Sequence, residues 1–170
     1  MRLNLGSLPR TQGLTPRQLW GTALAVAQAS RHGATLRAVD AAAAEHLDET
    51  ERTAARTAAA LMAMNNVYYR FVHLCSRGDY AGMPARLRMQ ALARPGVEKA
   101  DFELFCLAVS AVNGCGMCID AHEKALVDAG HVGPETVQAA VRVAAVIHGV
   151  AATLEAEDAL AQGREAGQAA

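Results

Sequence analysis

FELFCLAVSAVNGCGMCIDAHEKAL, residues 102–126, decides the fold and holds the most distinctive chemistry of the chain. Its first half is apolar on nearly every side, which predicts a buried helix over about residues 98–112. Asn113-Gly114 is a turn-forming pair that ends this helix, and a second helix is expected over about residues 115–130. The stretch therefore predicts a helical hairpin with two cysteines at the start of its second helix.

The rest of the chain has the composition of an all-α protein. Its 170 residues are 52% hydrophobic and 4% aromatic with five prolines, so local propensity favours helix almost throughout. We expect one domain over residues 1–170, a bundle of about seven to nine helices. Thr15-Pro16 is a helix-start signal, and Asn65-Asn66 is a candidate break. Further helices are expected at about 16–31, 34–47, 84–92 and 136–155, before a polar tail at about 156–170 that is expected to fray. Another helix, capped by Asp48 or Thr50, is expected to include Leu61, Met62, Met64, Val67, Tyr68 and Phe71. Its apolar stripe of Leu61, Met62 and Met64 is interpreted as core packing before a binding site.

Charge and targeting signals narrow the partners. The net charge is −1 with acids and bases mixed along the chain, so no basic stripe is expected to bind nucleic acid. The first 13 residues lack the apolar core of a signal peptide, and polar residues such as Asn113 and His148 interrupt the later apolar runs. We expect a soluble cytoplasmic protein without a membrane anchor. In a reducing compartment, paired thiols among the four cysteines are more often catalytic or metal-binding than structural.

The spacing of Cys115, Cys118 and His122 is the strongest chemical signal. At positions i, i+3 and i+7 these residues fall within an arc of roughly 60° on one face of a helix. At a helix start, the unpaired N–H groups and the helix dipole favour the thiolate, which is the nucleophilic form. A Cys-x-x-Cys pair in this place is typical of a reactive, reversible dithiol.

Glu103 is expected to join this group through the hairpin. If the two helices fold back antiparallel, a residue about ten before the turn lies beside one about ten after it. Glu103 would then lie beside His122 or Lys124 and not beside the cysteines. A carboxylate next to His122 would orient its ring and raise its basicity, so that His122 can take the proton of Cys118. Cys115 is left to close the disulfide.

Each of these residues also has a structural interpretation. A zinc site needs four ligands, and Cys106 with His122 would complete one only awkwardly. Covalent haem needs a histidine directly after the second cysteine, where Ile119 stands. His122 can be a partly buried core histidine, and Glu103 an acid that favours the first helical turn. Cys75 and Cys106, in apolar surroundings, are expected in the core.

The stretch 102–126 resembles the alkyl hydroperoxidase D (AhpD) proteins of the carboxymuconolactone decarboxylase-like superfamily. The resemblance rests on an acid twelve residues before the Cys-x-x-Cys and a histidine four residues after its second cysteine. It extends to LTPRQLWGTALA at 14–25, MAMNNVYYR at 62–70 and LRMQALARPGVEKADFEL at 87–104. It thus covers the chain from about residue 13 to 156.

The resemblance implies a function and roles for individual residues. It implies an all-helical subunit of a homotrimer with thiol-dependent alkyl hydroperoxidase and disulfide reductase activity. Cys118 would be the peroxidatic nucleophile, Cys115 the resolving cysteine of a redox-active disulfide, and His122 and Glu103 the proton relay. Dihydrolipoamide on a 2-oxo acid dehydrogenase component would supply electrons, and a peroxiredoxin would receive them. No metal or tightly bound cofactor is implied.

Met117 is the departure from the family's pattern. Members of the family carry a histidine just before the second cysteine, where this chain has Met117, so a relay through that ring is missing here. Three alternatives remain open at the level of sequence. The chain can be an electron-relay adaptor with little peroxidase activity, a non-catalytic zinc-binding helical protein, or a decarboxylase or other non-redox enzyme of the superfamily.

Overall fold

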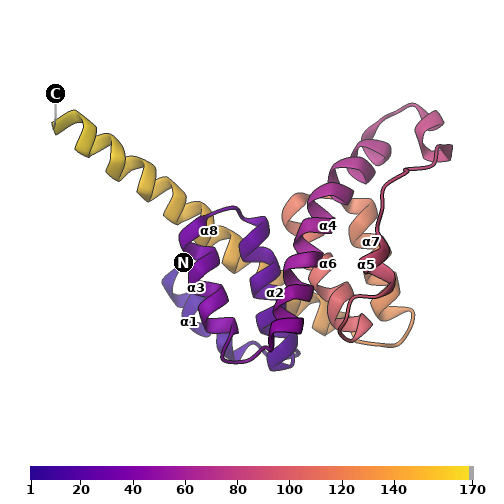
Figure 1. Cartoon of the computed structure of the whole chain (residues 1–170), viewed down its shortest axis with the longest axis horizontal. Helices are drawn as coiled ribbons and strands as arrows, with labels where there is room; N and C mark the ends of the chain where they lie inside the picture. Colours follow the sequence, from indigo (N-terminus) through magenta and orange to yellow (C-terminus); the bar gives the residue numbers. More distant parts are fainter. Residues whose placement is uncertain (169–170) are drawn as a thin grey trace.

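A computed structural model describes the backbone of residues 1–168 and the side chains of residues 1–164. The described part of the chain is an all-α bundle of eight α-helices and two short 3₁₀ helices (Figure 1). The predicted fold class and number of helices are confirmed. In chain order the elements are α1 Arg2–Ser7, η1 Leu8–Arg10, α2 Pro16–Ala29, α3 Gly33–Ala43, α4 Glu49–Leu74, η2 Gly78–Gly82, α5 Gln90–Ala93, α6 Lys99–Asn113, α7 Gly116–Val127 and α8 Pro134–Gln168.

Capping boxes fix the starts of two long helices. Thr15 Oγ1 accepts a hydrogen bond from the Gln18 backbone at 3.2 Å, and the Gln18 side chain accepts one from the Thr15 backbone. Asp48 and Glu51 make the same pair of bonds at the start of α4. Each box satisfies two N–H groups that have no partner within the helix. The predicted starts of α2 and α4 are therefore confirmed.

The centre of the core is the contact of α2 with α4 and α6. Gly21 lets α2 and α6 approach closely, because a side chain there would overlap the ring of Phe105. Three of the eight buried residues of α2 are alanines, whose small side chains also keep the helices close. Helices α7 and α8 cover the other sides of α6. As Figure 1 shows, the C-terminal ends of α4 and α8 project from the bundle on opposite sides.

The predicted break at Asn65-Asn66 is wrong, whereas the predicted start of α3 is off by one residue. Asn65-Asn66 does not break α4, which runs unbroken from Glu49 to Leu74. The side chain of Asn66 is bonded to other helices instead of competing for the backbone of its own helix. Helix α3 begins at Gly33, one residue before its predicted start, because the His32 side chain accepts a hydrogen bond from the Thr35 backbone and caps the helix.

The predictions for the later segments also need correction. The helix expected at 84–92 is limited to α5, Gln90–Ala93, and the 3₁₀ helix η2 precedes it. The tail expected to fray from about residue 156 continues α8 as far as Gln168, and residues 169–170 lie outside the described residues. Alanine is the most frequent residue of the segment 156–168, and it is the strongest helix former.

The prediction that polar residues keep every apolar run too short to span a membrane does not hold for helix α8. Its residues Pro134–Arg164 are long and apolar enough to cross a membrane by length and composition. His148 does not shorten the apolar run enough to prevent this. Core helices pass the same test, and Val143 and Ile147 of α8 are buried in the bundle core. One such helix is weak support for a membrane span.

Candidate active site

The turn between α6 and α7 places the two cysteines. Gly114 ends α6 in the left-handed conformation, with φ 67° and ψ 38°, which glycine adopts without steric cost. The Cys115 backbone N–H then bonds the Ser110 carbonyl at 3.1 Å, so Cys115 becomes the N-cap of α7. Cys118 follows in the first turn of α7. The predicted hairpin and its turn are confirmed.

Cys115 and Cys118 are joined by a disulfide, with a Cα–Cα distance of 5.3 Å. Both side chains are buried, Cys115 fully and Cys118 with 7% of its surface exposed. The structure thus shows the oxidised form of the dithiol. Because Cys118 keeps the exposed part, it is the sulfur that a reductant can approach.

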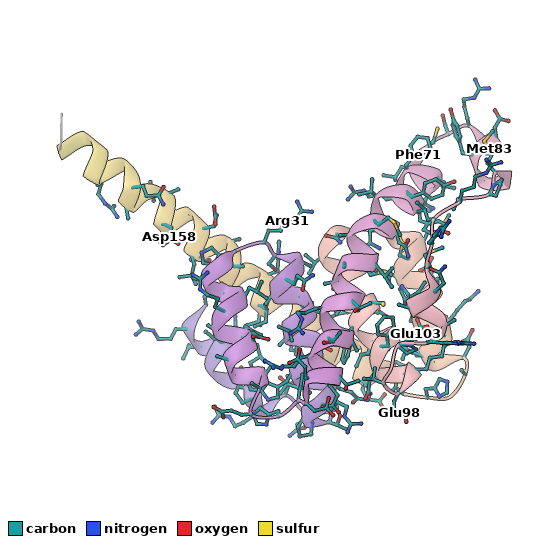
Figure 2. The ribbon with its side chains drawn as sticks, in the orientation of Figure 1. Arg31, Phe71, Met83, Glu98, Glu103 and Asp158 are labelled. Atoms are coloured by element: carbon teal, nitrogen blue, oxygen red, sulfur yellow. A yellow bond between two sulfur atoms is a disulfide. The ribbon has the colours of Figure 1, made fainter. Side chains whose placement is uncertain are left out.

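Glu103 and His122 form a buried pair behind the disulfide. His122 Nδ1 lies 2.6 Å from Glu103 Oε2, and each residue is 8% exposed. Figure 2 shows Glu103 inside the part of the bundle that contains α6 and α7. An antiparallel hairpin predicts either His122 or Lys124 as the neighbour of Glu103. The neighbour is His122, and Lys124 is exposed.

The second nitrogen of His122 makes a contact that the sequence did not indicate. His122 Nε2 lies 3.3 Å from the Met62 sulfur of α4. Within the described residues no hydrogen bond joins His122 to Cys118, whose sulfur is held in the disulfide. His122 and Cys118 nevertheless line the same pocket. Cys118 and His122 therefore face the same space, although no hydrogen bond between these two described residues is formed while the disulfide is closed.

This pocket lies between α4, the α5 region and α7, with a volume of about 320 Å³. Its walls are mostly apolar, and Met117 of the Cys-x-x-Cys stretch is part of them. The lining residues are Met62, Asn65, Tyr69, Met89, Leu92, Met117, Cys118, Ala121 and His122. The pocket has the apolar character of sites that take organic molecules.

Helix α4 contributes residues to the pocket that were not predicted as site residues. Met62, Asn65 and Tyr69 stand at i, i+3 and i+7, the same spacing as Cys115, Cys118 and His122. They therefore share one face of α4. This periodicity is present in the sequence, but the stripe that includes Met62 is predicted to be core packing before a binding site. Met62 is indeed 1% exposed, and it also contacts His122.

The remaining cysteines differ from their prediction in one case. Cys106 is fully buried, as expected, and burial together with the nearby Glu103 carboxylate raises its pKa well above the usual thiol value. It is therefore a protonated, unreactive thiol at neutral pH. Cys75, which was also expected in the core, is only half-buried because it caps the projecting end of α4. Among the described residues, no group of three or more His, Cys, Asp and Glu is arranged to hold a metal ion.

The fold and the disulfide define the class of the molecule: an all-helical dithiol protein with its cysteine pair at a helix start. The sequence model of the carboxymuconolactone decarboxylase family matches residues 78–162, which include α6 and α7. The chain belongs to this family and, within it, to the AhpD proteins.

Three relatives support this assignment, and each is named alkyl hydroperoxide reductase AhpD. The protein of Rhodospirillum centenum is 56% identical over 160 residues, which cover 94% of this chain and 86% of that protein. The protein of Bradyrhizobium sp. strain BTAi1 is 57% identical over 156 residues, covering 92% and 86%. The protein of Gluconacetobacter diazotrophicus is 54% identical over 167 residues, covering 98% and 91%.

Proposed function

We propose that this protein is a thiol-dependent alkyl hydroperoxidase and disulfide reductase of antioxidant defence. The observation that carries the proposal is the Cys115–Cys118 disulfide, whose Cys118 lines an apolar pocket together with His122. The Glu103 carboxylate, 2.6 Å from His122, supports a role for that ring as a base. The names of the relatives support hydroperoxide as the substrate.

The first half of the cycle oxidises the dithiol. His122 takes the proton of the Cys118 thiol, and the thiolate attacks the terminal oxygen of the hydroperoxide. The O–O bond breaks, Cys118 becomes a sulfenic acid, and the leaving alkoxide receives the proton from His122 as it departs as alcohol. Cys115 then attacks the sulfenic sulfur, which closes the disulfide and releases water.

The second half of the cycle restores the thiols. A dithiol reductant attacks the more exposed sulfur, Cys118, and its second thiol resolves the mixed disulfide. Two electrons pass from the reductant to the cysteines, and the reductant leaves as a cyclic disulfide. We propose dihydrolipoamide on a 2-oxo acid dehydrogenase component as this donor, because its thiols stand on a slender apolar arm that suits the apolar pocket. No tightly bound cofactor enters the cycle.

The proposal also includes a protein partner, an oligomeric state and a cellular location. The reduced dithiol can also pass electrons to a peroxiredoxin. The exposed apolar side chains of Val67, Phe71 and Leu74 on the projecting end of α4, with Met83 beyond it, support assembly into a homotrimer (Figure 2). We propose a cytoplasmic location, where a reducing environment keeps the pair in use.

The test compares peroxide-dependent oxidation of dihydrolipoamide by the wild type, Cys118→Ser and Cys115→Ser, with Cys75→Ser as the matched control outside the pocket. Wild type and Cys75→Ser should turn over, and both site variants should not. Adding a peroxiredoxin distinguishes the electron relay, because turnover only with the partner would remove direct peroxidase activity. Stoichiometric zinc in protein purified without added metal, with unreactive thiols, would contradict the dithiol function altogether.

A further inference from the structure

Asn65 is a buried polar residue without an evident structural partner. It lies on α4 and is 4% exposed, and its carbonyl oxygen Oδ1 has no hydrogen-bond partner in the described part of the chain. Burial of an unbonded amide oxygen costs free energy, so such a group in a native fold calls for an explanation. A polar ligand that completes the missing bond is one.

The position of Asn65 indicates what that ligand is. Among the described residues, two other buried side-chain atoms lack a partner, Thr22 Oγ1 and Arg52 Nε. Of the three residues, Asn65 alone lines the pocket of Cys118 and His122. The other pocket walls are largely thioether, aliphatic and aromatic side chains. Helix α4 contributes two polar side chains to this pocket, Asn65 and Tyr69, and of the two only Asn65 has a buried atom without a partner among the described residues. Asn65 is therefore the side chain on α4 best suited to orient a substrate beside Cys118.

We propose that the Asn65 carboxamide binds the hydroperoxide group and aligns its terminal oxygen with Cys118. A hydroperoxide R–O–O–H has one donor and two acceptor oxygens, and a carboxamide has a matching acceptor and donor. Because Oδ1 has almost no accessible surface, the carboxamide rotates towards the pocket when the hydroperoxide binds. The terminal O–H then donates to Oδ1, and the amide N–H donates to a peroxide oxygen. Asn65 changes no bond, since electrons and protons move only among Cys118, the peroxide and His122.

The same arrangement defines the substrate class. The apolar walls, which include Tyr69, Leu92 and Met117, surround the organic part of the molecule and the Asn65 amide holds its polar end. The pocket therefore favours organic hydroperoxides with a compact apolar group over hydrogen peroxide. This inference rests on the proposed peroxidase function and adds the residue that orients the substrate.

The test measures two second-order rates on the reduced protein, one with cumene hydroperoxide and one with iodoacetamide. Iodoacetamide reports the nucleophilicity of Cys118 without a peroxide group. Asn65→Leu, which keeps the size of the side chain, should lower the peroxide rate about tenfold, the worth of a strong hydrogen bond, and leave alkylation unchanged. Asn65→Ala serves if the leucine variant does not fold.

Thr22→Val is the matched control, because it also removes an unpartnered buried oxygen but lies on α2 in the core. It should change neither rate. An unchanged peroxide rate in Asn65→Leu would overturn the proposal, and so would an equal fall in both rates, which would indicate an effect on the thiolate. If the wild type reacts with peroxide no faster than free dithiothreitol, the proposed function itself fails.

The preference for organic substrates has its own control. Leu92→Ala should lower the ratio of the cumene hydroperoxide rate to the hydrogen peroxide rate, because Leu92 is part of the apolar wall that would surround the organic group. Asn65→Leu should lower both rates by a similar factor. If Asn65→Leu affected only the organic substrate, its role would be apolar packing and the proposed contact with the peroxide group would be wrong.

Discussion

Asn65 and Asn66 are consecutive buried residues of α4, and they differ in their hydrogen bonds. Asn66 donates to Ser110 Oγ at 2.9 Å and accepts from Asn113 Nδ2 at 2.9 Å. Asn65 Oδ1 has no partner within the residues that the structure describes, and its side chain lines the pocket. One face of α4 therefore hydrogen-bonds to α6 and its turn, and another face lines the pocket of Cys118 and His122.

The difference shows how one helix serves stability and function at once. Arg70, one turn after Asn66, donates to the Asn113 carbonyl at 2.6 Å and strengthens the same connection to the turn. These bonds from α4 hold the turn that positions Cys115 and Cys118. The Asn65 side chain takes no part in them. We call the two faces of α4 the turn face, with Asn66 and Arg70, and the pocket face, with Met62, Asn65 and Tyr69.

The largest effect is expected at the sulfur that the pocket face covers. Cys118→Ser should abolish peroxide-dependent oxidation of dihydrolipoamide, because a serine hydroxyl is neither a comparable nucleophile nor able to form the disulfide. Cys106→Ala removes a thiol of similar burial whose raised pKa keeps it inert, and it should retain activity. Loss of activity in both variants to the same degree would remove the distinction between the two sulfurs.

Glu103→Gln should have the next largest effect. The amide keeps the shape of the contact with His122 but removes the carboxylate that holds the ring in place through Nδ1, so the peroxide rate should fall about 100-fold. Stopped-flow oxidation of the reduced protein by an alkyl hydroperoxide measures this rate. A variant with the wild-type rate at every pH would show that Glu103 has a structural role only.

Asn66→Leu tests the turn face. It leaves the buried Ser110 Oγ and the half-buried Asn113 Nδ2 without their partner, so the free energy of unfolding should fall by about 2 kcal/mol. Urea denaturation measures the loss. Asn65→Leu is the matched control on the pocket face and should unfold at the same or a higher urea concentration. Equal destabilisation by the two variants would contradict the comparison.

Gly114→Ala tests the turn itself. A Cβ at Gly114 meets nothing within 4 Å, so the expected cost is that of the left-handed backbone alone, about 1 kcal/mol. Thermal unfolding checks this value. A cost well above that of Asn66→Leu would show that the backbone of the turn, rather than its link to α4, holds the cysteines in place.

Asp101→Asn should have the smallest effect and separates the two acids of α6. Burial raises the pKa of Asp101 above its ordinary value, against the hydrogen bond that Gln18 donates. A raised pKa means that the folded state binds the proton more tightly, so this stability is present below the unfolded pKa and is lost as pH rises through the folded value. The asparagine variant should lose less stability than the wild type as pH rises from about 4, the ordinary value, and keep its peroxide rate.

Local signals explain what the sequence could predict. Asn113-Gly114 marks a turn by its own chemistry, and helical phase places Cys115, Cys118 and His122 on one face. The turn limits the neighbour of Glu103 to His122 or Lys124, because an antiparallel hairpin determines which residues lie opposite each other, and the structure shows that the neighbour is His122. All of this information lies within about 20 residues, as the separation of 19 between Glu103 and His122 shows.

The features that were missed depend on contacts between distant segments. Asn65-Asn66 looked like a helix break because its bonds to Ser110 and Asn113, 44 and 47 residues from Asn66, are not visible in the local sequence. The packing of Met62 on His122 spans 60 residues and was missed for the same reason. The roles of the site residues remain predictions that the proposed variants test.

The most direct test of the dithiol mechanism is peptide mass spectrometry of reduced Cys115→Ser after treatment with an alkyl hydroperoxide and a reagent that labels sulfenic acid. Without Cys115 the cycle stops at its first product, so the label should appear on Cys118, while the wild type should form the Cys115–Cys118 disulfide and remain unlabelled. A label on Cys75 or Cys106, or none on Cys118, would contradict the assignment of Cys118 as the residue that attacks peroxide.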